Sequence, residues 1–303
     1  MSQGDFRVTV TTTGELRAKR SVQIQGPPNA QQAQQFGMRV DPLPDIIRPV
    51  VAINGVWRVT RPSSEIHFEP GMSLRPDFTI IRSLFRFGLP TGVQGIAMNV
   101  GGVLLLRFIG SLEHSAAAQA AYAVGYTELF SLITWTSVGL MGASATIAGQ
   151  NLGAGNPERA MHGVNVASGI GLTVAAVVGA MFLLIPQQLL GVFGMTEPLV
   201  ASLGEELLRY LSVSGLFITV ALSYTGGLQG TGDTRSPLYI SVVSQIGIPI
   251  GLIMIFRASG SLEPGEIWLA IVVGHFTRAA LSVARFRQGK WRQIAVDIET
   301  ARP

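Results

Sequence analysis

The chain has 303 residues, of which 48% are hydrophobic and 13% are Asp, Glu, Lys or Arg, and its net charge is +4. A soluble domain carries about 25% charged residues, and only 16 of those in this chain lie between residues 84 and 284. So few charges cannot cover a soluble surface. The composition therefore argues against a cytosolic enzyme and indicates a membrane protein with short polar ends.

Other classes of partner receive little support from the composition. The basic residues flank apolar segments and form no patch interleaved with aromatic side chains, so no nucleic-acid partner is expected. The chain has no cysteine and four histidines with no close pair. Disulfides and Cys-based metal sites are thus excluded, and a metal site is not expected. No clustered acid and base residues or nucleophile motif indicate an enzyme.

The N-terminal region differs from the rest of the chain. Residues 1–30 lack the apolar segment of a signal peptide. Phe6, Val8 and Val10 alternate with polar residues, which is typical of a strand. We expect residues 1–75 to be a small soluble region, β-rich or disordered.

Six apolar windows follow, each bounded by Pro, Gly or charge and long enough to cross a hydrocarbon core of about 30 Å as a helix. The predicted fold is an all-α membrane protein, a six-transmembrane-helix bundle over residues 76–290 with a tail at 291–303. The windows are residues 91–109, 117–139, 164–185, 207–228, 238–256 and 267–286.

The flanking charges predict the orientation of these spans. Arg82, Arg86, Arg159, Arg235 and Arg285 flank the windows at one end of the predicted bundle, and fewer basic residues flank the other. Because basic residues concentrate on the cytoplasmic side, we expect both termini in the cytoplasm of a multi-pass inner-membrane (plasma-membrane) protein.

Two glycine-rich loops connect the windows at this basic end. Glycine allows tight turns and close helix approach, so the residues alone favour hairpin loops between spanning helices. The loop residues of interest are Gly149, Gln150, Asn151, Gly153 and Gly155 after the second window, and Gly227, Gln229, Gly230, Gly232, Asp233 and Thr234 after the fourth.

These loops, together with Gly88-Leu-Pro90 expected to open the first span, resemble the C-terminal half of a multidrug and toxin extrusion (MATE) transporter over residues 75–290. The resemblance implies one lobe of a two-lobed transporter that binds substrate between its lobes. Residues 5–25 also resemble, over a short length, the start of a periplasmic adaptor (membrane-fusion) protein.

Glu128 is the first candidate for ion or substrate binding, because an ionisable side chain within a span is costly and often functional. Ser131 and Trp135 follow it on one helical stripe. This stripe suits a proton, Na⁺ or an organic cation, and a protonated Glu128 bonded between helices is an equal alternative. Some MATE members carry carboxylates at positions that match Met98 and Ile218 here, so their coupling site does not transfer.

Further candidates lie in the first and last spans. His275 and Arg278 are spaced i,i+3 in the sixth window, and a link from Arg278 to Glu128 is possible. A structural role, with Arg278 reaching toward the basic end, is the alternative. Gln94 and Asn99 lie on different faces of the first span, so one is expected to line a cavity and the other to bond a neighbouring helix.

The expected function is half of a secondary antiporter that exports cationic or amphipathic compounds, a multidrug efflux and xenobiotic transport role. H⁺ or Na⁺ would be the coupling ion, and no other cofactor is expected. The expected partners are the lipid bilayer, the small-molecule substrate, and a second lobe from another chain or a second copy. A transport-inactive truncated or rearranged product, at most a membrane assembly partner, is the alternative.

Overall fold

The computed structural model describes residues 78–294. The predictions for residues 1–75, including the resemblance of residues 5–25, lie outside the described residues. Helices fill the described part of the chain, and no strand occurs within it. The helices are α3 (Phe78–Ile109), α4 (Ser115–Tyr122), η2 (Ala123–Leu129), α5 (Ser131–Gly153), α6 (Pro157–Leu184), α7 (Pro186–Val192), α8 (Pro198–Gly230), α9 (Arg235–Val242), η3 (Val243–Gly247), α10 (Ile248–Ser259), α11 (Pro264–Arg287) and η4 (Lys290–Gln293).

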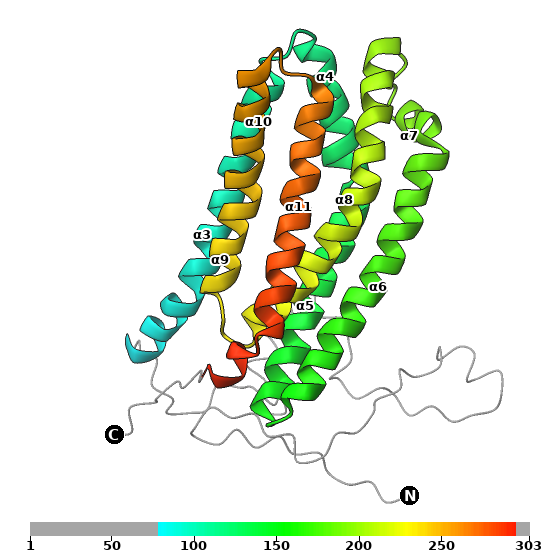
Figure 1. The fold of residues 1–303 in the computed structure, drawn as a ribbon. Helices are drawn as coiled ribbons and strands as arrows, with labels where there is room; N and C mark the ends of the chain where they lie inside the picture. The colour runs from blue at the N-terminus through cyan, green and yellow to red at the C-terminus, as the bar shows by residue number, and fades with distance from the viewer. Residues whose placement is uncertain (1–77, 295–303) are drawn as a thin grey trace, which may run out of the picture. The chain divides into compact units, whose positions relative to one another are not determined.

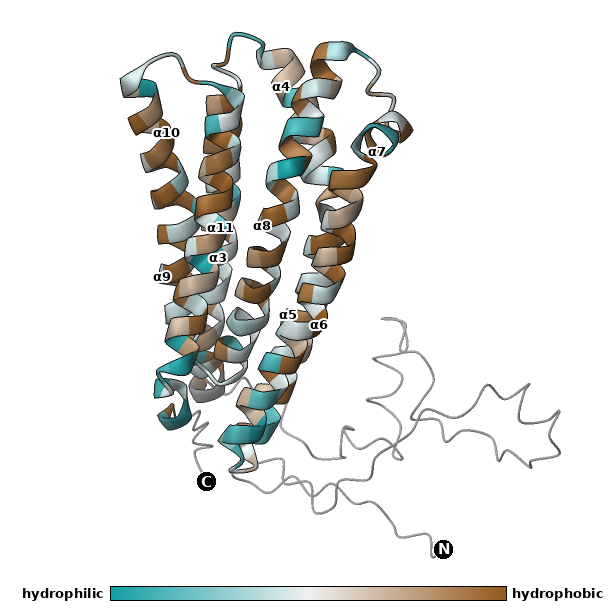
Figure 2. Ribbon diagram, turned by 45° about the vertical axis from the view of Figure 1, so that its right-hand side comes forward, coloured by the Kyte–Doolittle hydropathy of each residue, from teal (hydrophilic) through white to brown (hydrophobic). Residues whose placement is uncertain are grey.

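All six predicted spans are confirmed as helices long and apolar enough to cross a membrane. Most of them extend beyond the predicted windows, and hydrophobic residues occupy much of their length (Figure 2). Pro157, Pro198 and Pro264 each stand in the first turn of a helix, where a missing N–H costs nothing.

The first span differs from its prediction at its start. Gly88-Leu-Pro90 was expected to open the span, but α3 begins at Phe78 and continues through Pro90. Proline inside a helix removes one backbone hydrogen bond, which membrane helices tolerate where neighbouring groups compensate. The polar turn expected before Pro90 is therefore the first part of a longer helix.

Two of the spans contain a π-helical segment. The second span runs from α4 through η2 into α5, and the fifth runs from α9 through η3 into α10. In η2 the backbone N–H of Phe130 donates to the carbonyl of Gly125, an i→i+5 bond of 3.0 Å. Such segments hold an extra residue per turn and occur frequently at functional sites.

Helix α8 is the most enclosed of the spans, with 78% of its apolar window buried. It packs against α5, α6 and α11, which surround it in the bundle (Figure 1). The larger buried cluster includes Leu207, Leu208 and Leu211 of α8. A smaller cluster near the glycine-rich loops contains Leu228, Phe286 and Trp291, so Trp291, which the sequence analysis placed in the tail, packs with the bundle.

Glycines bring α5 and α8 into backbone contact. A side chain at Gly226 would collide with the carbonyl oxygen of Met141, and one at Gly230 with that of Ala145. A Cβ on Gly149 would lie 2.7 Å from the carbonyl oxygen of Gly230. The Gly226 and Gly230 pair is a small-xxx-small motif, the pattern that lets membrane helices approach most closely.

We expect Gly226→Ala to lower the stability of the bundle, because the added methyl group meets a backbone atom that cannot move independently. The cost is about 1–3 kcal/mol, as for overpacked cores, and appears as a lower melting temperature in detergent. Gly142→Ala is the matched control on α5, since its Cβ meets nothing within 4 Å. Equal melting temperatures for both variants would contradict the role of this contact.

Candidate functional site

The η2 segment carries a row of aromatic side chains that faces α11. Tyr122 stacks on Tyr126 with ring centroids 4.9 Å apart, and Tyr126 lies 5.3 Å from Phe130. The His275 ring of α11 stacks 5.9 Å from Phe130 and 6.5 Å from Tyr126. The hydroxyl of Ser214 on α8 contacts Nδ1 of His275, so the buried imidazole joins three spans.

Glu128 belongs to the same π-helical segment, but its side chain is exposed on the surface of the bundle. Its neighbours Tyr126 and Phe130 stack on His275, the twelfth residue of the 24-residue helix α11. Glu128 is therefore level with the middle of a membrane-spanning helix. A carboxylate at this depth is costly unless it faces water or a polar partner.

The other two members of the predicted stripe continue this surface. Trp135 is 74% exposed, and Ser131 is half-buried, with its hydroxyl donating to the backbone carbonyl of Glu128. A hydroxyl engaged in this way is held close to the carboxylate-bearing turn. The structure thus leaves an acid and an aromatic ring accessible on one helix, one to two turns apart.

Arg278 lies one turn after His275 in α11 and is only 2% exposed. Within residues 78–294, its Nε and Nη1 atoms have no hydrogen-bond partner. The possible link to Glu128 does not form, because Arg278 is enclosed by the bundle while Glu128 lies on its outer surface. A buried guanidinium without a partner is energetically costly, which keeps Arg278 a candidate for function.

Gln94 and Asn99 take different roles on α3. The Gln94 side chain is buried, donates to Oγ of Ser241 on α9 at 2.7 Å and accepts from Nε2 of Gln229 on α8 at 3.1 Å. It is therefore the residue of the pair that bonds neighbouring helices. Asn99 is exposed and donates to the carbonyl of Gly95 within its own helix.

The two glycine-rich loops end their helices in the same way. At the end of α5, Asn156 N–H bonds to the Asn151 carbonyl and Gly155 N–H to that of Leu152. At the end of α8, Asp233 bonds to Leu228 and Gly232 to Gln229 in the same pattern. These are two Schellman caps, and Gly155 (φ 73°) and Gly232 (φ 89°) supply the left-handed residue that each requires.

The remaining loop residues have structural contacts. Gly227 lies against Val164 and Phe286, where a Cβ would collide with both side chains. The side chain of Asn151 donates to the carbonyl of Ile147 at 2.8 Å, and the carbonyl of Gln150 accepts from Ala154 at 3.0 Å. Gly153 has open space around it, and Thr234 is buried at the start of α9.

Asp233 forms a buried ion pair at the second loop. One of its carboxylate oxygens accepts from Nε and Nη2 of Arg285 at 2.8 and 2.7 Å, and from the hydroxyl of Ser236 at 2.9 Å. The other oxygen accepts from the Ser236 backbone N–H at 3.2 Å and so caps α9. The pair fastens the end of α11 to the start of α9.

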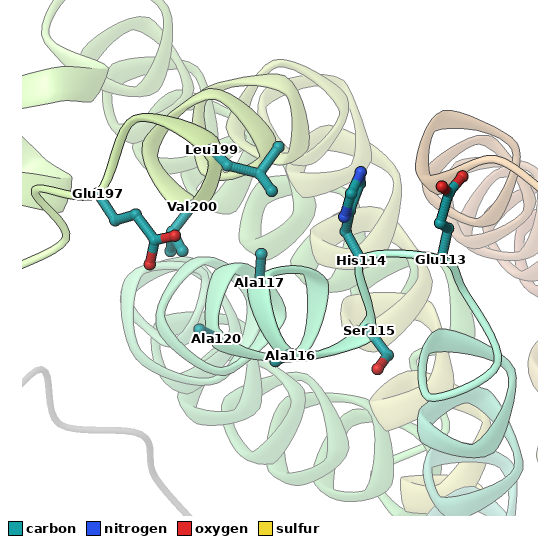
Figure 3. A pocket seen from close by; sticks show the side chains of 9 residues that line it. All are labelled: Glu113, His114, Ser115, Ala116, Ala117, Ala120, Glu197, Leu199 and Val200. Atoms are coloured by element: carbon teal, nitrogen blue, oxygen red, sulfur yellow. The ribbon is translucent and has the colours of Figure 1, made fainter.

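A pocket of about 430 Å³ lies at the opposite end of the bundle, between the starts of α4 and α8. Figure 3 shows Glu113 and His114 at one side of it and Glu197 at the other. Sequence reasoning placed these residues in outward-facing loops but did not group them, because 83 positions of sequence separate His114 from Glu197. In the described part of the chain, no group of three acidic or histidine residues suits a metal ion.

Single-cysteine labelling tests whether the Glu128 surface meets water, and the chain is suited to it because it contains no cysteine. Ser131→Cys should react with a water-soluble maleimide in proteoliposomes at least about tenfold faster than Val177→Cys, since a thiol in hydrocarbon stays protonated and unreactive. Val177 is exposed on α6, two residues before Gly179, which contacts Ser212 of α8. It is thus a control close in depth, and equal labelling rates would contradict an aqueous surface at Glu128.

We expect Asp233→Asn to destabilise the bundle by about 2 kcal/mol, because it leaves the Arg285 guanidinium without a charged partner. The control Glu158→Gln breaks the pair between Arg292 and a 76% exposed glutamate and should change the stability by less than about 1 kcal/mol. Thermal unfolding of both variants in detergent measures the difference. A larger effect of Glu158→Gln would contradict the buried pair as the anchor of α9.

Six long apolar helices with these loops define a multi-pass helical membrane protein. A family model described as MatE matches residues 90–255. The chain belongs to this family.

Curated relatives agree with this assignment. A protein of Thermotoga maritima named "Probable multidrug resistance protein NorM" is 22% identical over 265 residues, covering 86% of this chain and 55% of the relative. "Multidrug resistance protein MdtK" of Pectobacterium atrosepticum is 25% identical over 222 residues, covering 71% of this chain and 47% of the relative. The chain thus spans about half the length of the curated relatives that it matches.

Solved structures show the same fold. An outward-facing multidrug resistance MATE family transporter superimposes with a TM-score of 0.71 at 18% identity, covering 80% of this chain and 54% of that chain. The eukaryotic MATE transporter AtDTX14 gives a TM-score of 0.67 at 22% identity, covering 78% of this chain and 52% of that chain. The predicted fold, a MATE-like lobe of six membrane helices, is confirmed.

Proposed function

We propose that this chain is the C-terminal lobe of a secondary antiporter that exports cationic or amphipathic compounds across the plasma membrane in exchange for H⁺ or Na⁺. Names of the curated relatives refer to multidrug resistance, which supports small organic molecules as substrates. The basic end of the bundle, with both termini, faces the cytoplasm in this proposal.

The observation that carries the proposal is the exposed carboxylate of Glu128 at mid-membrane depth. A charged side chain there costs about 2.5–3.5 kcal/mol on insertion scales if it faces lipid. This cost favours an arrangement in which the surface of η2 and α5 lines an aqueous path. Glu128 then binds the coupling ion or the substrate cation, and Trp135 offers a ring face to an organic cation.

Transport in this arrangement requires a second lobe. Substrate sites of such transporters lie at the interface of two structural repeats, which rock against each other to alternate access. The exposed apolar residues beside Glu128, among them Leu132 and Val138, suit contact with such a lobe. In the proposal it comes from another chain or from a second copy of this one.

The pocket at the far end of the bundle fits the same direction of charge. Its rim carries the carboxylates of Glu113 and Glu197, and acidic mouths raise the local concentration of cations. A protonmotive or sodium-motive cycle needs no organic cofactor and no covalent chemistry. No feature of residues 78–294 favours the alternative of a transport-inactive product.

Reconstitution tests the role of Glu128. Proteoliposomes that contain this chain, with an imposed H⁺ or Na⁺ gradient, should move the fluorescent cation ethidium. Glu128→Gln should lower the gradient-driven rate at least about tenfold, because a neutral amide cannot exchange a proton or pair with a cation.

The matched control is Glu113→Gln, which removes an exposed carboxylate outside the spans and should change the rate less than about twofold. Gradient-independent leakage in the wild-type vesicles, or equal rates for Glu128→Gln and the wild-type chain, would overturn the proposal.

A further inference from the structure

A second pocket, of about 400 Å³, is lined by Arg82, Ser83 and Arg86 of α3 and by Arg235 of α9. Arg82 and Arg86 are spaced i,i+4 and therefore project from one face of α3. Arg235 opens α9, where the positive end of the helix dipole adds to its charge. The fold thus gathers three guanidinium groups from segments about 150 residues apart in sequence.

These three charges are not neutralised by the described part of the chain. Among residues 78–294, the two ion pairs are Arg285 with Asp233 and Arg292 with Glu158. Asp233, the acidic residue closest to Arg235 in sequence, is already occupied by Arg285 and Ser236. The pocket is therefore a site of concentrated positive charge, and guanidinium groups bind phosphate oxygens in bidentate geometry.

The pocket lies where the first and fifth spans begin. The apolar stretches of these spans start at Ile81 and Arg235, so the three arginines stand at the level of lipid headgroups. Helices α3 and α9 are neighbours, joined by the bond between Gln94 and Ser241. A free anion in solution would not need this position, whereas a lipid phosphate is present there at high local concentration.

Two exposed apolar tracks lead from the pocket into the membrane. On α3, Leu89 and Val93 follow Arg86 at helical spacing, and on the fifth span Tyr239 and Val243 follow Arg235. All four side chains are exposed. Tyrosine is enriched at the membrane interface, where its ring lies among chains and its hydroxyl among headgroups.

We propose that this pocket binds the phosphate of an anionic phospholipid whose acyl chains lie along the two apolar tracks. Basic pockets between transmembrane helices bind anionic headgroups in this way. The lipid is held at the seam between α3 and α9, on a surface separate from Glu128. The site is independent of the proposed transport.

Native mass spectrometry of the delipidated full chain tests the proposal. The chain should retain phosphatidylglycerol at least about tenfold better than phosphatidylcholine with the same acyl chains, because only the former has a net negative headgroup. Each of R82Q, R86Q and R235Q should weaken phosphatidylglycerol retention about fivefold, and the triple variant should abolish the preference.

The matched controls are R159Q and R287Q, which remove exposed arginines outside the pocket and should leave retention within about twofold of the wild type. Phosphatidylglycerol should also raise the melting temperature of the wild-type chain but not of the triple variant. Equal retention of both lipids, or an equal loss in the control variants, would overturn the proposal. Displacement of the lipid by inorganic phosphate at equal concentration would show a site for free anions and would also overturn it.

Discussion

The backbone contact between α5 and α8 determines the position of most other elements. Gly226 and Gly230 meet the carbonyls of Met141 and Ala145, so the two helices approach as closely as their backbones allow. Because α6 and α11 also pack on α8, its position fixes theirs. The same contact brings Gly149 against Gly230, so the ends of the two helices and their loops lie together. Asp233 then reaches Arg285 at the end of α11.

One π-helical segment serves both the interior and the surface of the bundle. Its wider turns let Tyr122, Tyr126 and Phe130, each four positions apart, keep facing α11. The same turns direct Glu128 outward at the level of His275. The aromatic stack thus supplies a rigid support for an acidic side chain at a depth where an isolated charge is costly. The polar seam around Gln94, Ser241 and Gln229 holds α3 to α8 and α9.

The sequence allowed prediction of the six spans, because twenty apolar residues between polar boundaries have few other uses. The glycine-rich loops were also placed correctly, since left-handed positions such as Gly155 and Gly232 favour glycine. The start of α3 was missed because Pro90 suggests a helix start, although its first-turn role is only one of those that proline takes in membranes. The exposure of Glu128 and the arginine pocket depend on helix rotation and on contacts between distant segments, which periodicity alone does not determine.

The i→i+5 turn in η2 has a consequence for how this span tolerates changes in length. A π-turn is equivalent to one residue inserted into a regular α-helix. Loss of a single residue from η2 would leave a continuous helix of good geometry, but it would rotate everything before it by about 100° relative to α5. Tyr122 and Tyr126 would then leave α11 while every backbone hydrogen bond could still form. The extra residue therefore acts as a register mark that ties the outer third of the span to the inner two thirds.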